Sequence, residues 1–181
     1  LGARPARDGE RWAPELEGGG AAGHLAAGGG AGRATPQVFN HLMQQLPALV
    51  ATMRAHLQPW LPELISVVLQ HWHGPLLLQV LTLLEQMTIV LRHALRPHAA
   101  RLVPLLAAVL ERDTSAQRVP SLTALGALEG FGPDLPEFSG LLLPPMVALV
   151  ADASPGSRTL LETLEALHRL SAWLPLPAAQ L

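Results

Sequence analysis

The chain has 181 residues, of which 49% are hydrophobic and only 14% are charged, and its formal net charge is -2. This length can bury a sizeable core, and the slight negative charge argues against recognition of nucleic acid through a basic face. All 12 basic residues are Arg, and the lack of Cys excludes disulfides and thiolate chemistry. We therefore expect an intracellular, cytoplasmic protein that has no nucleic-acid partner.

Residues 1–34 are predicted to form a disordered, flexible linker or a low-complexity insertion. They are rich in Gly, Ala, Arg and Pro, with the run GGGAAGHLAAGGGAG at 18–32. Such a segment buries too little apolar surface to offset the entropy of ordering. The run also lacks the Lys-Ser/Thr ending of a phosphate-binding loop, so no nucleotide site is expected there. The chain starts with Leu1 instead of Met, and we expect it to be a fragment of a longer protein.

Helical periodicity begins at Thr35 and Pro36, which suit an N-cap and a first helical position. The apolar residues that follow at three- or four-residue spacing predict one apolar stripe on a helix. They are Val38, Leu42, Leu46, Leu49 and Met53. We interpret this segment as the second helix of a hairpin whose first helix is missing or degenerate.

The rest of the chain repeats one plan. Trp60, His98 and Phe138 are predicted to start equivalent helices, at spacings of 38 and 40 residues. A period near 40 with two helices per unit indicates HEAT or armadillo repeats. Proline inside a helix removes a hydrogen bond and kinks it. Pro104 and the pair Pro144 and Pro145 are therefore predicted helix kinks, which favour HEAT.

These patterns predict an all-α protein: an α-solenoid of about 3.5 antiparallel helix pairs over residues 35–175, followed by a tail at 176–181. The second helices are expected at Pro75–His93, Ser115–Phe131 and Pro155–Trp173. The first of these is apolar on nearly all sides, which predicts burial. Its polar interruptions and its length make a membrane span improbable, so no transmembrane segment is predicted.

The turns inside the units also repeat. Asp113 is followed by Arg118, and Asp152 is followed by Arg158. Each Asp is predicted to cap the second helix of its own unit. Each Arg is predicted to reach the Asp of an adjacent unit, which would form a ladder along the stack. The preceding turn has His71–Gly74 in place of the Asp, and we expect a weaker ladder there.

No residue set predicts a catalytic, cofactor-binding or metal site. His71 and His73 offer two nitrogens, but no third ligand follows at a suitable spacing. Glu162 and Glu165 lie one turn apart, as expected of a solvated helix face. The aromatic residues Trp60, Trp72 and Phe138 are predicted to pack in the core or between repeats.

The stretch VLERDTSAQRVPSLTALGALEGFGPDLPEFSGLLLPPMVALV at 109–150 resembles the HEAT-repeat region of TOR (target of rapamycin), a kinase family related to phosphatidylinositol-3-kinases. Further similar segments are HLQPWLPELISVV at 56–68, LLEQMTIVL at 83–91 and, more weakly, ETLEALHRLSAWL at 162–174. Three features depart from the family pattern, one of which is the length of the turn at 151–158. Pro120 falls where the family continues a helix, and the Gly-rich start has no counterpart.

The resemblance implies a parent protein that phosphorylates Ser/Thr of growth-control substrates with ATP and Mg²⁺. It implies that this region is a non-catalytic scaffold, which binds regulatory subunits and shapes a dimeric kinase complex. No catalytic residue is carried over, because the sequence contains no Lys and no His-Arg-Asp or Asp-Phe-Gly motif. The alternatives are a stand-alone HEAT adaptor, such as a transport receptor or phosphatase scaffold, and an all-α lyase or hydrolase with a polar pocket.

Overall fold

The computed structural model describes residues 36–174. The predictions for residues 1–34 and for the tail at 176–181 lie outside this range. Eleven helical segments follow one another in the described part, and it contains no strand. They are α1 (Pro36–Met53), η1 (Arg54–Trp60), α2 (Leu61–His71), α3 (Leu77–Val90), α4 (Arg92–Leu95), η2 (Arg96–His98), α5 (Ala99–Arg112), α6 (Val119–Glu129), η3 (Gly132–Phe138), α7 (Ser139–Asp152) and α8 (Arg158–Ser171).

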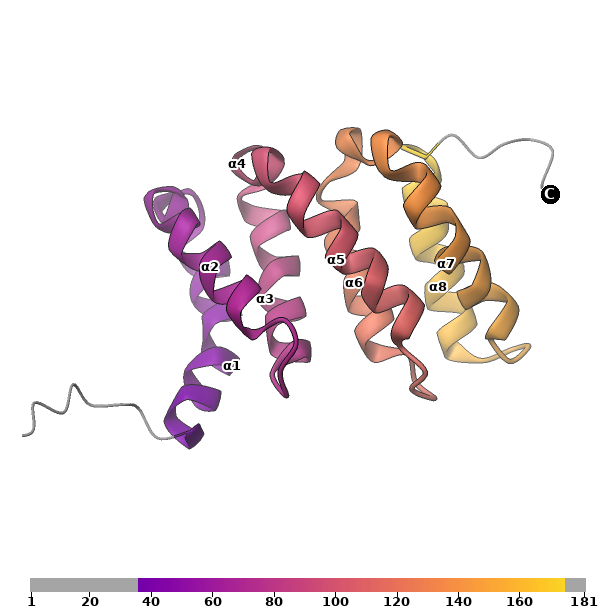
Figure 1. Ribbon diagram of the computed structural model, residues 1–181, viewed down its shortest axis with the longest axis horizontal. Coiled ribbons are helices and arrows are strands. Elements are labelled where there is room, and N and C mark those ends of the chain that lie inside the picture. The colour runs from indigo at the N-terminus through magenta and orange to yellow at the C-terminus, as the bar shows by residue number, and fades with distance from the viewer. Residues whose placement is uncertain (1–35, 175–181) are drawn as a thin grey trace, which may run out of the picture. The chain divides into compact units, whose positions relative to one another are not determined.

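The helices form two layers in a stack (Figure 1). In one layer α1 packs on α3, α3 on α6, and α6 on α8. The other layer holds α2, α5 and α7, and each lies against the second helix of its own pair. The described unit therefore consists of three antiparallel pairs, preceded by α1 in the second-helix layer. This arrangement confirms the predicted all-α solenoid and places α1 in the layer of second helices.

The predicted starts of the three first helices are correct to within one residue. The residues directly before α2, α5 and α7 are Trp60, His98 and Phe138. A short 3₁₀ segment precedes each of these helices, and each segment contains a proline. Those prolines are Pro59, Pro97 and Pro136. Proline is tolerated in such short segments because its ring fixes φ near the helical value and few backbone N–H groups there need partners.

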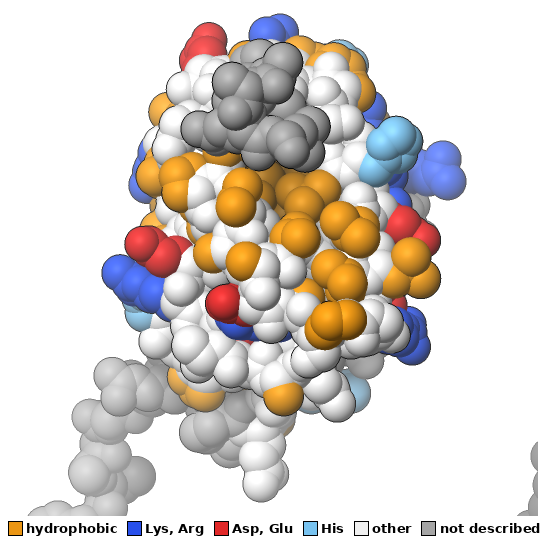
Figure 2. All heavy atoms as spheres, turned by 90° about the vertical axis from the view of Figure 1, so that its right-hand side faces the viewer, with side chains coloured by type: hydrophobic (Ala, Val, Ile, Leu, Met, Phe, Trp, Pro, Cys, Tyr) orange, Lys and Arg blue, Asp and Glu red, His pale blue; other side chains and the backbone are white. Residues whose placement is uncertain are grey.

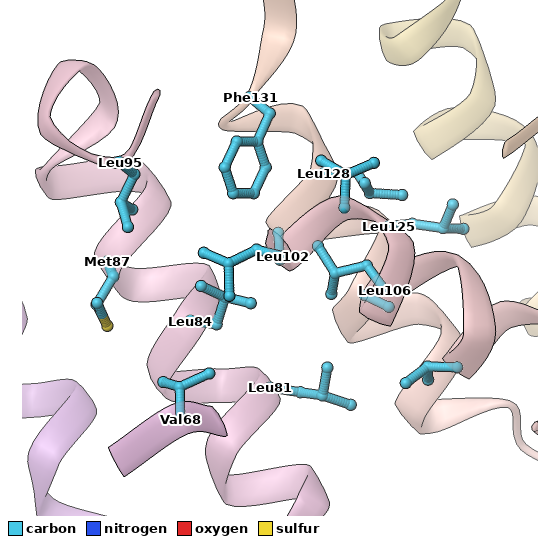
Figure 3. Packing of buried hydrophobic residues seen from close by; sticks show 14 of the residues in the cluster. Val68, Leu81, Leu84, Met87, Leu95, Leu102, Leu106, Leu125, Leu128 and Phe131 are labelled. Atoms are coloured by element: carbon cyan, nitrogen blue, oxygen red, sulfur yellow. The ribbon is translucent and has the colours of Figure 1, made fainter. Parts of the chain in front are cut away.

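The core lies between the two layers (Figure 3). Leu81 and Leu84 of α3 point toward Leu102 and Leu106 of α5, and all four side chains are fully buried. Each such leucine contributes roughly 1.5–3 kcal/mol through the surface that it removes from water. α3 also buries Val80, Leu83, Met87 and Thr88. It is therefore enclosed on most sides, as the sequence predicted.

The apolar stripe predicted for α1 is not its fully buried face. In α1 the fully buried residues are Met43 and Val50. Of the predicted stripe, Val38, Leu42 and Leu49 are exposed. Among the described helices α1 packs mainly on α3, so one face of α1 is covered and Val38, Leu42 and Leu49 stay in solvent.

The start of α6, predicted at about Ser115, lies four residues later, because the helix begins at Val119. Pro120 occupies the first turn, where its missing N–H has no helical partner to lose. The predicted helix over Pro75–His93 is interrupted at Leu91, whose ψ of 23° ends α3. α8 starts at Arg158, three residues later than predicted, because Ser157 is its N-cap.

Glu85 of α3 is half-buried at the contact with α6. Burial and the nearby Glu129 carboxylate both raise the pKa of the Glu85 carboxyl. A carboxylate with a raised pKa in the folded state destabilises the fold once it is ionised. This penalty is absent below the unfolded value and appears as the pH rises through the folded-state pKa.

Replacement Glu85→Gln is accordingly expected to increase the free energy of unfolding at pH 7, by less than about 1 kcal/mol because the group is partly in solvent. Denaturant titrations of both proteins between pH 3 and 8 measure this, and the difference should vanish below the ordinary glutamate value of about 4.5. Glu165→Gln, on the exposed face of α8, is the matched control and should change nothing. A gain for Glu85→Gln that persists at pH 3 would contradict the assignment.

One segment of the described residues, Gly132–Asp152, has the length and mean hydropathy (1.3) of a possible membrane span. It consists of η3 and α7, and it contains Pro133, Pro136, Pro144 and Pro145. In this structure α7 packs against α5 and α8 in the stack. Length and composition alone are weak grounds for a membrane span, and the core helix of a folded domain satisfies them equally.

Candidate functional site

Asp113 organises the turn between α5 and α6. Its Oδ1 accepts hydrogen bonds from Ser115 N (2.9 Å) and Ser115 Oγ (2.6 Å). Its Oδ2 accepts from Ser121 N (3.1 Å) and Ser121 Oγ (2.8 Å). Ser121 N belongs to the first turn of α6, where backbone N–H groups have no helical partner. Asp113 therefore acts as a cap for α6 from the opposite side of the turn.

The electrostatics of Asp113 follow from these bonds. Partial burial favours the neutral acid, but the four hydrogen bonds from Ser115 and Ser121 favour the carboxylate more strongly. The net effect lowers the pKa of the Asp113 carboxyl below its ordinary value of 3.8. This turn therefore holds an ionised carboxylate at neutral pH.

Arg118 and Asp152 form an ion pair between adjacent units. Arg118 Nη2 lies 3.2 Å from Asp152 Oδ2. Arg118 is the N-cap residue of α6 and has a left-handed backbone (φ 49°, ψ 29°), which costs a non-glycine residue about 1 kcal/mol. The turn after α7 places a glycine, Gly156 (φ 76°), in the left-handed region. The structure thus brings together two of the four predicted ladder residues.

Arg158 does not make the corresponding contact within the described residues. Its Nε lies 2.5 Å from Glu162 Oε1, one turn along α8, and its side chain is 90% exposed. Asp152 does not cap α8 either, because Ser157 Oγ accepts the hydrogen bond from Leu160 N (3.1 Å). The predicted capping role is wrong for Asp152: the turn after α7 supplies a serine directly at the N-cap position.

The Arg118–Asp152 pair is expected to contribute little to stability. Asp152 is mostly in solvent, and exposed ion pairs contribute roughly 0.2–1 kcal/mol. A double-mutant cycle with Arg118→Ala and Asp152→Ala should give a coupling free energy in that range, and 0.5 M NaCl should reduce it. A coupling above about 2 kcal/mol would show that the pair is a structural clamp.

Two further ion pairs between adjacent units were not predicted. Arg96 Nε lies 2.6 Å from Asp134 Oδ1, and Arg169 Nε lies 2.6 Å from Glu129 Oε1. The partners are separated by 38 and 40 residues. These separations equal the repeat spacings, so opposite charges one period apart were the signal that could have revealed them. Together with Arg118–Asp152 they give the seam between α5/α6 and α7/α8 a set of polar contacts.

The predicted kink prolines lie inside the first helices. Pro104 is in α5, and Pro144 and Pro145 are in α7. Pro104 and Pro144 each stand five residues after the first residue of their helix, so the two units are equivalent at this position. The proposed use of these prolines as architectural bends stays a prediction.

The histidine and aromatic candidates lie in different environments. The His71 ring lies against the Phe39 ring of α1, with centroids 4.8 Å apart. Trp72 is buried, and it lines a hollow of about 610 Å³ beside Leu105 and Pro120. Trp60, however, is 61% exposed, so its predicted packing role is wrong. Among the described residues no three His, Asp or Glu side chains gather as metal ligands would.

The chain is similar over most of its length to curated kinases. It is 30% identical over 135 residues to "Serine/threonine-protein kinase mTor" of Drosophila melanogaster, covering 74% of this chain and 6% of that protein. It is 35% identical over 116 residues to "Serine/threonine-protein kinase TOR" of Arabidopsis thaliana, covering 58% of this chain and 5% of the relative. The yeast "Serine/threonine-protein kinase TOR2" is 23% identical over 125 residues. No protein-family model matches the chain.

Proposed function

Because the chain is related in sequence to a short region of the TOR kinases, we propose that it is a non-catalytic scaffold segment built of HEAT repeats. The observation that carries this proposal is the stack itself, in which antiparallel pairs recur near 40 residues with prolines at equivalent positions. Such stacks expose long surfaces to protein partners. The partners proposed here are regulatory subunits of a dimeric, cytoplasmic TOR-type complex in nutrient and growth signalling.

The phosphotransfer chemistry is assigned to other parts of a longer protein. The chain spans only 6% of the fly relative, and its sequence has no Lys to contact phosphates. Asp113, Arg118 and Asp152, in the turns within the helix pairs, are engaged with serines or with one another, which suits a structural role. We therefore propose that ATP and Mg²⁺ bind outside this segment.

A chimera tests the scaffold role directly. The matching region of the fly kinase is replaced by residues 36–174 of this chain, and complex assembly and kinase activity are compared with those of a deletion of the same region. We expect the chimera to restore assembly with the regulatory subunits, whereas the deletion does not. A chimera that carries Gly130→Leu is the control for a misfolded insert.

Two results would contradict the proposal. One is a correctly folded chimera that assembles no better than the deletion. The other is ATP-dependent phosphotransfer by the 181-residue chain alone. A folded chain that instead binds subunits of a transport or phosphatase complex would favour the stand-alone adaptor.

A further inference from the structure

Two neighbouring hollows lie along one edge of the stack, and Arg92 and His93 of α4 border both of them. The first, of about 360 Å³, lies where α4, the start of η3 and the end of α8 meet. The second, of about 570 Å³, lies between α4, the end of α3 and η1. This edge is at the top of Figure 1, opposite the turns that follow α5 and α7. On the α7 and α8 end of the stack, charged side chains likewise lie toward the edge and apolar ones in the middle (Figure 2).

The first hollow, which we name the arginine hollow, is lined by more cationic than anionic side chains. Arg92, Arg96 and Arg169 line it, together with the carboxylates of Glu129 and Asp134. Arg96 pairs with Asp134 and Arg169 pairs with Glu129, each at 2.6 Å. Arg92 is exposed and forms no salt bridge with any described residue. The arginine hollow therefore has one positive charge in excess, in a chain whose formal net charge is -2.

An exposed tryptophan forms an apolar wall of the arginine hollow. Trp173 stands two residues beyond α8 and is 43% exposed. A Cβ on Gly132 would lie 3.4 Å from Trp173 Cε2, so the ring packs directly against this glycine. The buried Phe131 lines the hollow as well. Trp and Arg are enriched among the residues that dominate the binding energy of protein interfaces, so this combination favours a protein ligand.

The second hollow, which we name the apolar hollow, offers aliphatic surface next to Arg92. Ile89, at the end of α3, lines it and is 58% exposed. Val90, Ala94 and Ala55 line it too. A ligand that reaches from one hollow into the other would therefore meet apolar surface, then the Arg92 guanidinium, and then apolar surface again.

This order specifies the chemistry of the ligand. A guanidinium binds a carboxylate through two parallel hydrogen bonds, so Arg92 favours an acidic side chain. The apolar surfaces favour an apolar side chain on each side of that carboxylate. In an extended backbone, residues i, i+2 and i+4 point to the same face at intervals of about 7 Å. An extended peptide with an acidic residue at i+2 and apolar residues at i and i+4 therefore presents all three groups together.

We propose that the two hollows form a docking groove for an extended segment of a protein partner. A Glu or Asp side chain of that segment binds Arg92, and the flanking apolar side chains pack on Trp173 and Ile89. The proposal rests on the scaffold function proposed above and deepens it, because it identifies one kind of partner segment. Peptide binding is measured on this chain alone, whereas the scaffold function is measured by assembly of a complex, so the failure of either is distinguished from the failure of the other.

A symmetrical peptide tests the proposal whichever direction the bound segment takes. The probe is Gly-Phe-Ser-Glu-Ser-Phe-Gly, acetylated and amidated at its ends, and isothermal titration calorimetry measures its binding to the 181-residue chain. We expect saturable binding that 0.5 M NaCl weakens several-fold. The same peptide with Gln in place of Glu should bind about tenfold more weakly, because it loses the charged hydrogen bonds. Ser in place of both Phe residues should also weaken binding about tenfold.

Matched variants locate the binding site. Arg92→Ala should weaken binding about tenfold, and Trp173→Ala should weaken it to a similar extent. Arg112→Ala removes another exposed arginine, at the opposite edge of the stack, and should leave the affinity unchanged. Arg92→Glu should abolish binding of the Glu peptide, and it should bind the same peptide with Lys in place of Glu more tightly than the unmodified chain does. The denaturation midpoint of each variant shows whether it is folded.

Four results would overturn the proposal. Two are the absence of peptide binding and an affinity that neither Arg92→Ala nor the Gln peptide changes. The third is binding of inorganic phosphate as tight as that of the peptide, with no contribution from the Phe residues, because the groove would then be a site for small anions. The fourth is a dimer of the chain that Arg92→Glu dissociates, because a second copy would then be the occupant.

Discussion

Replacing Gly130 by alanine is expected to lower the free energy of unfolding by about 1–3 kcal/mol, the usual range for overpacking. Gly130 is buried where α6 crosses α3. A Cβ there would overlap the Thr88 Cβ, and it would lie 2.6 Å from Thr88 Oγ1 and 3.0 Å from the Thr88 carbonyl carbon. Thr88 cannot rotate away without cost, because its Oγ1 donates to the Glu85 carbonyl oxygen (2.7 Å). The two helices must therefore separate.

Two other glycines provide matched controls. A Cβ on Gly140, in α7, meets nothing within 4 Å, so Gly140→Ala should stabilise the chain by about 0.5–1 kcal/mol through helix propensity. A Cβ on Gly126 would meet only the end of the Glu85 side chain, which can move. The stability of Gly126→Ala should therefore fall between those of Gly130→Ala and Gly140→Ala. Urea titrations of the three variants measure their order of stability. Equal stability of Gly130→Ala and Gly140→Ala would contradict the close approach of α3 and α6.

Removal of the Asp113 carboxylate is expected to cost about 2 kcal/mol, because Asp113→Ala leaves two backbone N–H groups and two hydroxyls without their acceptor. The pH dependence has a definite sign. A carboxyl whose pKa is lowered in the folded state stabilises the fold above its unfolded pKa, and it loses that effect as the pH falls through the folded value. The difference between wild type and variant should therefore be full at pH 7 and shrink below the ordinary value of 3.8.

Asp152→Ala is the matched control. Asp152 lies in the equivalent turn, but it accepts a hydrogen bond only from Arg118, and its side chain is mostly in solvent. It should cost less than about 1 kcal/mol. Denaturant titrations at pH 7 and pH 3 compare the two variants. Similar losses at pH 7 would show that Asp113 is not the cap of α6.

Asp113 and Asp152 show how much of the two turns could be predicted from the sequence. Both residues follow the same pattern in the chain, and the pattern correctly marked both turns. The two turns differ in local backbone, however. In the turn after α5, Arg118 has the left-handed backbone conformation. In the turn after α7, Gly156 has this conformation, and Ser157 follows it as the N-cap of α8. The choice between a distant carboxylate cap and an adjacent serine cap depends on how the turn folds over the helix end.

The sequence by itself determined the fold class and the phase of the repeat. Recurrent apolar spacing, prolines before the first helices and a period near 40 placed the starts of α2, α5 and α7 at Trp60, His98 and Phe138. These signals are local, because they depend on helical periodicity and on the backbone limits of proline. The relation to the TOR kinases was likewise carried by residues in sequence.

Only the tertiary structure decided which apolar residues are buried and which charges meet. Val38 and Met43 are both apolar residues of α1, yet only Met43 is buried. Leu125 and Leu164 occupy equivalent positions, but Leu125, in a helix that packs on α8, is fully buried, whereas Leu164 is 46% exposed. Arg96 finds Asp134 because the seam brings residues 38 apart into contact. Burial and ion pairing depend on which elements pack beside a helix, and helical periodicity alone does not specify those neighbours.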